Sequence, residues 1–142
     1  MRFWDTSALI PLVVAERETA RVERWLREDP GVVVWTLTRV EALSALARRR
    51  REEPPAARRL AAARREFLTG WERWSEVTAL DLVRRHPERI VETHPLRASD
   101  ALQTGAAIVA ADDHPAMLEF VTLDLRQAEA AEREGFRILG PE

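Results

Sequence analysis

The chain has 142 residues, of which 46% are hydrophobic and 32% charged, and its formal net charge at pH 7 is −2. This composition excludes a disordered chain, and the absence of cysteine excludes disulfides, zinc–thiolate sites and cysteine nucleophiles. No apolar run approaches the roughly 20 residues that a membrane span requires, so we expect residues 1–142 to form one domain in the cytoplasm, with no membrane partner.

The first half of the chain alternates short apolar runs with longer helical patterns. Val32–Trp35 is a β-branched run typical of a buried strand, and Pro54 and Pro55 stop the helical pattern that precedes them. In chain order we expect a strand at Phe3–Trp4 with a helix after it, a helix from Glu18 to Arg27, the strand at Val32–Trp35, a helix from Leu37 to about Arg51, and a helix through Leu60 and Phe67 to Gly70.

The second half begins with Val77–Leu80, which is either a weak strand or the start of a helix, and then continues the alternation. His86-Pro87 and His94-Pro95 break the chain. Beyond them we expect a helix from Ala98 to Ala111, a strand at Phe120–Leu123, a helix from Leu125 to Glu134 and a last strand at Phe136–Leu139. Strands that alternate with helices of ten or more residues indicate the α/β class, with a central parallel sheet and helices on both faces.

Two acidic residues follow predicted strands directly. Asp5 comes after Phe3–Trp4, and Asp124 ends the run Val121-Thr122-Leu123-Asp124. Ligands of open parallel sheets gather outside the carboxyl ends of the strands, so both carboxylates are expected at the functional edge. The alternative for each is a structural role at the N-terminus of the following helix.

Two further acidic residues lie on predicted helices that are otherwise apolar. Glu41 has Leu37 and Ala45 beside it on its helical face, and a charge in such surroundings needs an ion-pair partner or a metal. A salt bridge to Arg39 or Arg48 is the alternative. Asp100 begins a helix with few other polar residues, where a first-turn acid that stabilises the helix is again the alternative.

Taken together, the four acids predict a metal site. Converging carboxylates repel one another and raise one another's pKa, and a divalent cation removes that conflict. No His-x-x-x-His spacing exists, so any ion must be held mostly by carboxylates, which favours Mg²⁺ or Mn²⁺.

Four segments in order resemble the motifs of the PIN domain family. They are Phe3-Trp4-Asp5-Thr6-Ser7-Ala8-Leu9, Thr36-Leu37-Thr38-Arg39-Val40-Glu41-Ala42-Leu43-Ser44-Ala45-Leu46, Leu96-Arg97-Ala98-Ser99-Asp100-Ala101-Leu102-Gln103 and Phe120-Val121-Thr122-Leu123-Asp124. Together they cover nearly the whole chain. Within the family, the length is most similar to VapC, the toxin of type II toxin–antitoxin pairs.

The resemblance implies an endoribonuclease that uses Mg²⁺ or Mn²⁺, forms a homodimer, cleaves RNA and is neutralised by a small VapB-type antitoxin. Carried over by position, the catalytic and metal-binding residues are Asp5, Glu41, Asp100 and Asp124. The supporting polar residues are Thr6, Ser7 and Thr122. Gln103 stands where relatives often carry histidine and is assigned no catalytic role. Asp112 and Asp113 are expected in a solvated loop, with a position near the metals as the alternative.

An arginine-rich segment is the candidate contact with RNA or with the antitoxin. Residues 39–65 contain nine arginines against three acidic residues, and arginine binds phosphates and stacks on unpaired bases. The alternatives are a solvated helical face or a dimer contact. The candidate contact residues of this segment are Arg48, Arg49 and Arg51; Arg126, two residues after Asp124, is a further candidate that could pair with Asp124 instead.

Three other functions remain open at this point. The first is a PIN nuclease of RNA processing or decay that has no antitoxin. The second is a non-catalytic module that binds RNA or protein. The third, a phosphatase with Asp5 as nucleophile, is disfavoured because Ser7 occupies the position where such enzymes carry a second aspartate, and because the chain contains no lysine.

Overall fold

The structure, a computed structural model, describes residues 1–141. At its centre lies a parallel five-stranded sheet in the order β3-β2-β1-β4-β5. The strands are β1 (Arg2–Trp4), β2 (Val32–Trp35), β3 (Ser75–Val77), β4 (Glu119–Val121) and β5 (Arg137–Leu139). The predicted α/β class with a parallel central sheet is confirmed.

Alternate residues of the central strands pack against opposite faces of the sheet. In β1, Phe3 belongs to one hydrophobic core and Trp4 to the other, and in β4 the same holds for Phe120 and Val121. Side chains of a strand alternate between its two faces, so a strand covered on both sides is apolar wherever a core packs on it; the exceptions, Arg2 and Glu119 at the starts of β1 and β4, pair with each other. This explains why the apolar runs at β1, β2 and β4 are continuous.

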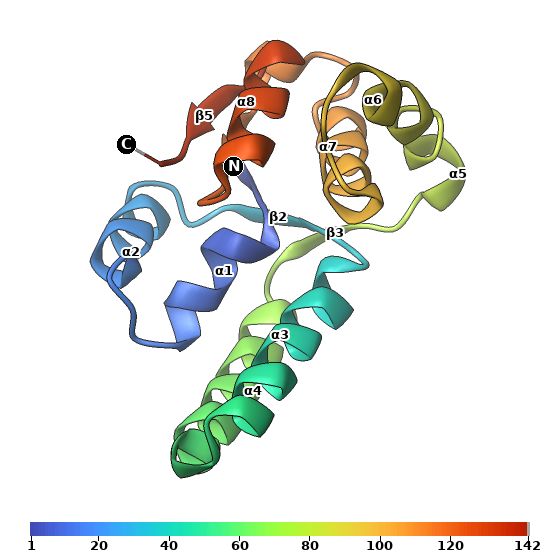
Figure 1. The fold of residues 1–142 in the computed structure, drawn as a ribbon. Helices are drawn as coiled ribbons and strands as arrows, with labels where there is room; N and C mark the ends of the chain where they lie inside the picture. The colour runs from blue at the N-terminus through green and yellow to red at the C-terminus, as the bar shows by residue number, and fades with distance from the viewer. Residues whose placement is uncertain (142) are drawn as a thin grey trace.

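The first four helices cover the face that carries Trp4 and Val121. Figure 1 shows α3 and α4 as an antiparallel hairpin that extends away from the sheet. The helices are α1 (Thr6–Val13), α2 (Thr19–Glu28), α3 (Thr38–Glu52) and α4 (Ala57–Trp71), with a short 3₁₀ turn at Pro54–Ala56 between the last two.

The remaining helices cover the face that carries Phe3 and Phe120. They are α5 (Leu80–Val83), α6 (Pro87–Thr93), α7 (Ala98–Ala110) and α8 (Leu125–Arg133), with a 3₁₀ turn at Pro115–Met117. Helix α6 lies between the two His-Pro pairs, where the sequence predicted only breaks. Proline suits the first turn of a helix because the N–H it lacks has no partner there.

The strand order sets the location of the candidate site. β1 is central, and the chain moves outward from it through β2 to β3 before it returns to β4 on the other side. The order therefore reverses between β1 and β4, where open parallel sheets bind their ligands. Asp5 follows β1 and Asp124 lies three residues beyond β4, so both acids lie at this point.

No helix within residues 1–141 is both long and apolar enough to cross a membrane.

Aromatic side chains at the end of α4 belong to the hydrophobic core on the face of the sheet that carries Trp4, which provides a test of the fold. Phe67 is fully buried, and its ring centroid lies 5.7 Å from that of Trp71 and 5.8 Å from that of Trp74. Because its removal leaves a cavity, Phe67→Ala should lower the free energy of unfolding by about 3–5 kcal/mol, measured by urea denaturation. The exposed neighbour Arg64 gives the control: Arg64→Ala should change it by less than about 0.5 kcal/mol. Equal effects would contradict the packing described.

Candidate metal centre

Asp5 is the most deeply buried of the four acids, with 5% of its surface exposed. It is the N-cap of α1, and its backbone N–H donates to Val121 O of β4 at 2.9 Å. Its Oδ2 accepts hydrogen bonds from Ser7 Oγ at 2.6 Å, Thr122 Oγ1 at 2.9 Å and Ser7 N at 3.3 Å. Within residues 1–141 no hydrogen bond reaches Oδ1, which leaves that oxygen for another ligand.

The two hydroxyls that serve Asp5 are themselves oriented by backbone N–H groups. Leu123 N donates to Ser7 Oγ at 2.8 Å, and Asp124 N donates to Thr122 Oγ1 at 3.1 Å. Each hydroxyl has one hydrogen to give, and with its oxygen engaged in this way it directs that hydrogen to Asp5. The network joins the end of β4 to the start of α1. Both Ser7 and Thr122, which the sequence predicted as supporting residues, hydrogen-bond to the carboxylate of Asp5.

Burial raises the pKa of Asp5 above its usual value, although the bonds from Ser7 and Thr122 oppose the shift. The charge of Asp124 raises the pKa further. Asp5 makes no salt bridge within residues 1–141. A buried, ionised carboxylate without a cation beside it lowers the stability of the folded protein. A positive ion next to Asp5 would therefore stabilise the fold.

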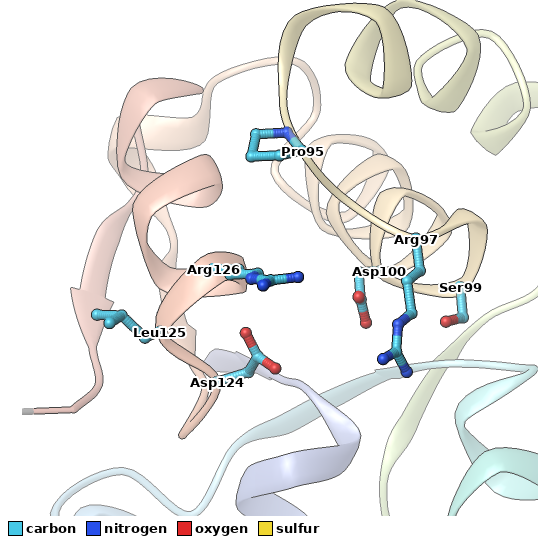
Figure 2. A pocket seen from close by; sticks show the side chains of 7 residues that line it. All are labelled: Pro95, Arg97, Ser99, Asp100, Asp124, Leu125 and Arg126. Atoms are coloured by element: carbon cyan, nitrogen blue, oxygen red, sulfur yellow. The ribbon is translucent and has the colours of Figure 1, made fainter.

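Asp100 and Asp124 face each other across a cavity of about 500 Å³. Figure 2 shows the two carboxylates approaching from α7 and from the start of α8, with Arg97 beside Asp100 and Arg126 on the opposite wall. Asp124 is also the N-cap of α8, where its Oδ1 accepts from Gln127 N at 2.9 Å. The cavity is lined by Pro95, Arg97, Ser99, Asp100, Asp124, Leu125 and Arg126.

Asp100 interacts electrostatically with two of the other acids. Partial burial raises its pKa, and the charges of Asp5 and Asp124 raise it further, while Arg97 lowers it. Asp100 lies in the first turn of α7, where a helix stabilises negative charge, so the helical role predicted as the alternative coexists with the position beside the other acids.

Glu41 approaches the cluster from the first turn of α3. Thr6 Oγ1 donates to Glu41 Oε2 at 3.1 Å. Burial raises the pKa of Glu41, and the charges of Asp5 and Asp100 add to the shift. Within the described residues Glu41 forms no salt bridge, and Arg39 lies 3.8 Å from Glu72 instead, so the predicted alternative of a structural ion pair is not found.

The four acids therefore lie within electrostatic reach of one another, but they are not packed around a point. Among residues 1–141, no three histidine, aspartate or glutamate side chains are placed so that they could hold one ion by themselves. Mg²⁺ keeps several of its waters and binds through one or two protein carboxylates. The donor set, all carboxylate oxygens with one free oxygen on Asp5, fits a hydrated ion of this kind.

Two buried glutamines also contact this region, and neither was assigned a role from the sequence. Gln103 on α7 lies beside Thr6, Thr38 and Glu41. Gln127 on α8 donates from Nε2 to Asp100 O at 3.0 Å. The polar Gln103 in an otherwise apolar helix was the available signal, since buried polar side chains usually have partners.

The arginines predicted as contact residues lie in different surroundings. Arg126 lines the cavity between Asp100 and Asp124, and Arg48 lines a groove of about 420 Å³ that also contains Glu41. Arg51 is exposed near the end of α3. Arg49 forms an ion pair with Glu16, which ties α3 to the loop before α2. The exposed Asp112 and Asp113 lie on the turn after α7 and line a separate pocket with His86.

Comparison with known proteins identifies relatives of the fold. The model of the PIN domain family matches residues 2–133, and no curated protein matches the chain. The crystal structure of PAE2754 from Pyrobaculum aerophilum is similar with a TM-score of 0.63 and 22% identity, over 97% of this chain and 88% of that one. The crystal structure of FitAcB from Neisseria gonorrhoeae is similar with a TM-score of 0.60 and 17% identity, over 97% and 96%. At these identities the structural likeness establishes the fold alone.

Removal of the Asp5 charge is expected to stabilise the protein when divalent ions are absent. Folding raises the pKa of Asp5 above 3.8, so protonation of Asp5 adds to the free energy of unfolding. This contribution is fully present below about pH 4 and is lost as the pH rises through the pKa of the folded state. In EDTA at neutral pH, Asp5→Asn should raise the free energy of unfolding in urea by about 1–3 kcal/mol, since asparagine caps a helix as well as aspartate does. The exposed Asp112 supplies the control, and Asp112→Asn should have an effect below about 0.5 kcal/mol. A less stable Asp5→Asn protein would refute the electrostatic account.

Proposed function

The chain belongs to the PIN domain family, whose members are generally nucleases, and on that premise we propose that it is a metal-dependent endoribonuclease and the toxin of a type II toxin–antitoxin pair. The observation that carries the proposal is the placement of Asp5, Glu41, Asp100 and Asp124 near the reversal of the strand order, where the charges of Asp5, Asp100 and Asp124 raise the pKa of neighbouring carboxylates. Such a cluster suits a divalent cation and a phosphodiester.

The four acids have distinct tasks in the proposed mechanism. A bound Mg²⁺ or Mn²⁺ supplies activation of a water molecule and stabilises charge on the phosphoryl oxygens. Asp5 would hold the ion with the oxygen that accepts no hydrogen bond, because Ser7 and Thr122 occupy its Oδ2. Asp100 would contribute a carboxylate from the start of α7. Glu41 and Asp124 bind directly or through waters, as the carboxylates around Mg²⁺ often do.

The arginines of the cavity are assigned to the phosphate groups of the substrate. Arg126 and Arg97 line the same cavity as Asp100 and Asp124, so they would meet a phosphate group that entered it. One guanidinium group can donate two parallel hydrogen bonds to two oxygens of the same phosphate. Arg48, in the groove beside Glu41, is assigned to an adjacent phosphate, and the exposed Arg51 to RNA or to the antitoxin. Arg49 has its ion pair with Glu16.

The choice of RNA, of a VapB-type antitoxin and of a homodimer rests on the resemblance of the four motifs to VapC toxins. We propose that the protein works in the cytoplasm, where RNA and a small antitoxin meet it. An antitoxin gene next to the gene of this chain would support the toxin role. Its absence would favour a PIN nuclease of RNA processing or decay.

Cleavage of RNA and binding of metal are the two consequences to measure together. With Mn²⁺ or Mg²⁺, the wild-type protein freed of any antitoxin should cleave a mixture of structured RNAs, and EDTA should abolish cleavage. Mn²⁺ should also raise its melting temperature, because a ligand of the folded state stabilises it. Asp5→Asn should lower the cleavage rate by at least about 100-fold and remove the Mn²⁺-induced rise.

The matched control is Asp112→Asn, an exposed aspartate in a separate pocket, which should cleave and bind Mn²⁺ as the wild type does. If folded wild-type protein neither cleaves RNA nor responds to Mn²⁺, the chain is a non-catalytic binding module instead.

Arg126 offers a test of the phosphate assignment. In the uncleaving Asp5→Asn background, Arg126→Gln should weaken binding of single-stranded RNA and reduce the slope of log affinity against log salt by about 0.7, the contribution of one phosphate contact. Arg133→Gln is the control, because Arg133 is exposed at the far end of the same helix and should leave the slope unchanged. An unchanged slope for Arg126→Gln would exclude it as a phosphate contact.

A further inference from the structure

The side chain of Gln103 is fully buried in the core of the protein, beside the candidate metal centre. It extends from α7 toward α1 and α3. Its Nε2 donates to Thr38 Oγ1 at 2.8 Å and to Thr6 Oγ1 at 3.1 Å, and it lies 3.5 Å from Glu41 Oε2. Each of these atoms belongs to an element that carries or adjoins one of the four acids.

The chemistry of these neighbours fixes the orientation of the Gln103 amide. An ionised carboxylate only accepts hydrogen bonds, so the amide must present its nitrogen, not its oxygen, to Glu41. As a result Oε1 points away and, within residues 1–141, has no hydrogen-bond partner although it is buried. An unpaired buried carbonyl is unfavourable, so the amide keeps this orientation at a cost to stability.

A hydrogen-bond relay connects Gln103 to Glu41 through Thr6. The Thr6 hydroxyl has a single hydrogen, and its oxygen already accepts from Gln103 Nε2 at 3.1 Å. The hydroxyl therefore directs its hydrogen to Glu41 Oε2 at 3.1 Å. This arrangement repeats the one around Asp5, where backbone N–H groups orient the hydroxyls of Ser7 and Thr122. At Glu41 a buried side chain supplies the N–H.

We propose that Gln103 is a positioning residue that, through Thr6, holds Glu41 Oε2 in place and so leaves Oε1 of Glu41 free for the ion. The assignment rests on the proposed metal-dependent function. Within residues 1–141 no hydrogen bond reaches Glu41 Oε1, so that oxygen is the one left for the ion or its waters. Groups that orient a metal ligand in this manner affect metal affinity strongly although they never touch the metal.

Gln127 provides an internal comparison. It is equally buried, and its Oε1 also lacks a partner within the described residues. Its Nε2 donates to Asp100 O at 3.0 Å and to Thr104 Oγ1 at 3.2 Å, with no carboxylate among these acceptors. Loss of the Gln127 amide therefore reports the effect of removing a buried amide that contacts an acid only through its backbone carbonyl, whereas loss of the Gln103 amide also releases the carboxylate of Glu41.

The test measures Mn²⁺ affinity by titration calorimetry, without any need for RNA or cleavage. Gln103→Leu should weaken Mn²⁺ binding by about 10- to 100-fold, while Gln127→Leu should weaken it by less than about threefold at a similar loss of thermal stability. If the two variants lose Mn²⁺ affinity equally, Gln103 acts only through the core and the assignment is overturned.

A double-mutant cycle with Glu41→Gln separates positioning from general damage. In the Glu41→Gln background, Gln103→Leu should cause no further loss of Mn²⁺ affinity, because its effect passes through Glu41. An equal loss in both backgrounds would overturn the assignment.

Thr6→Val tests the same relay without a change in the core, should Gln103→Leu fail to fold. It should weaken Mn²⁺ binding by a similar factor, and an unchanged affinity would overturn the relay. If the wild type itself binds no Mn²⁺, the metal-dependent function fails and this assignment fails with it. Normal Mn²⁺ binding by the wild type and by both Gln103→Leu and Thr6→Val would leave the function intact and overturn the inference alone.

Discussion

The repulsion among four carboxylates, gathered at one edge of a parallel sheet, is the constraint on which the rest of the structure depends. Asp5 is buried without a salt bridge within residues 1–141, and burial together with the neighbouring charges raises the pKa of Asp5, Glu41 and Asp100. Folding alone would disfavour this arrangement. A divalent cation at the site would stabilise the arrangement, because each carboxylate would then be attracted to the ion.

The fold opposes that repulsion with a rigid frame. β1 lies in the middle of the sheet, so Asp5 is held between the ends of β2 and β4, and the cores on both faces are filled by alternate residues of the same strands. Hydroxyls then fix one oxygen of Asp5 and one of Glu41, each oriented by an N–H group. The remaining oxygen of each, Oδ1 of Asp5 and Oε1 of Glu41, accepts no hydrogen bond within residues 1–141, and fixed, unoccupied acceptors of this kind are what metal-assisted hydrolysis needs.

The sequence predicted the frame well and the contacts poorly. The strand predicted at Val32–Trp35 agrees residue for residue with β2, because a continuous β-branched run has few other interpretations. The positions of Asp5 and Asp124 after β1 and β4 were predicted because ligands of parallel sheets gather at the carboxyl ends of the strands. The role of Gln103 was not predictable, because its partners Thr6 and Glu41 are 97 and 62 residues away in the chain. Local sequence patterns carry no information on pairs so far apart. Helix α6 was not predicted, because the prolines at its start and after its end, Pro87 and Pro95, indicate breaks in the chain as readily as helix starts.

The central claim is that the four acids form one metal centre, and an anomalous difference map from a crystal of the protein grown with Mn²⁺ tests it most directly. The account predicts a Mn²⁺ peak in the space shared by Asp5, Glu41, Asp100 and Asp124, bound to Oδ1 of Asp5 and surrounded by waters that reach the other carboxylates. A strong peak elsewhere on the protein, with none among these four residues, would contradict it.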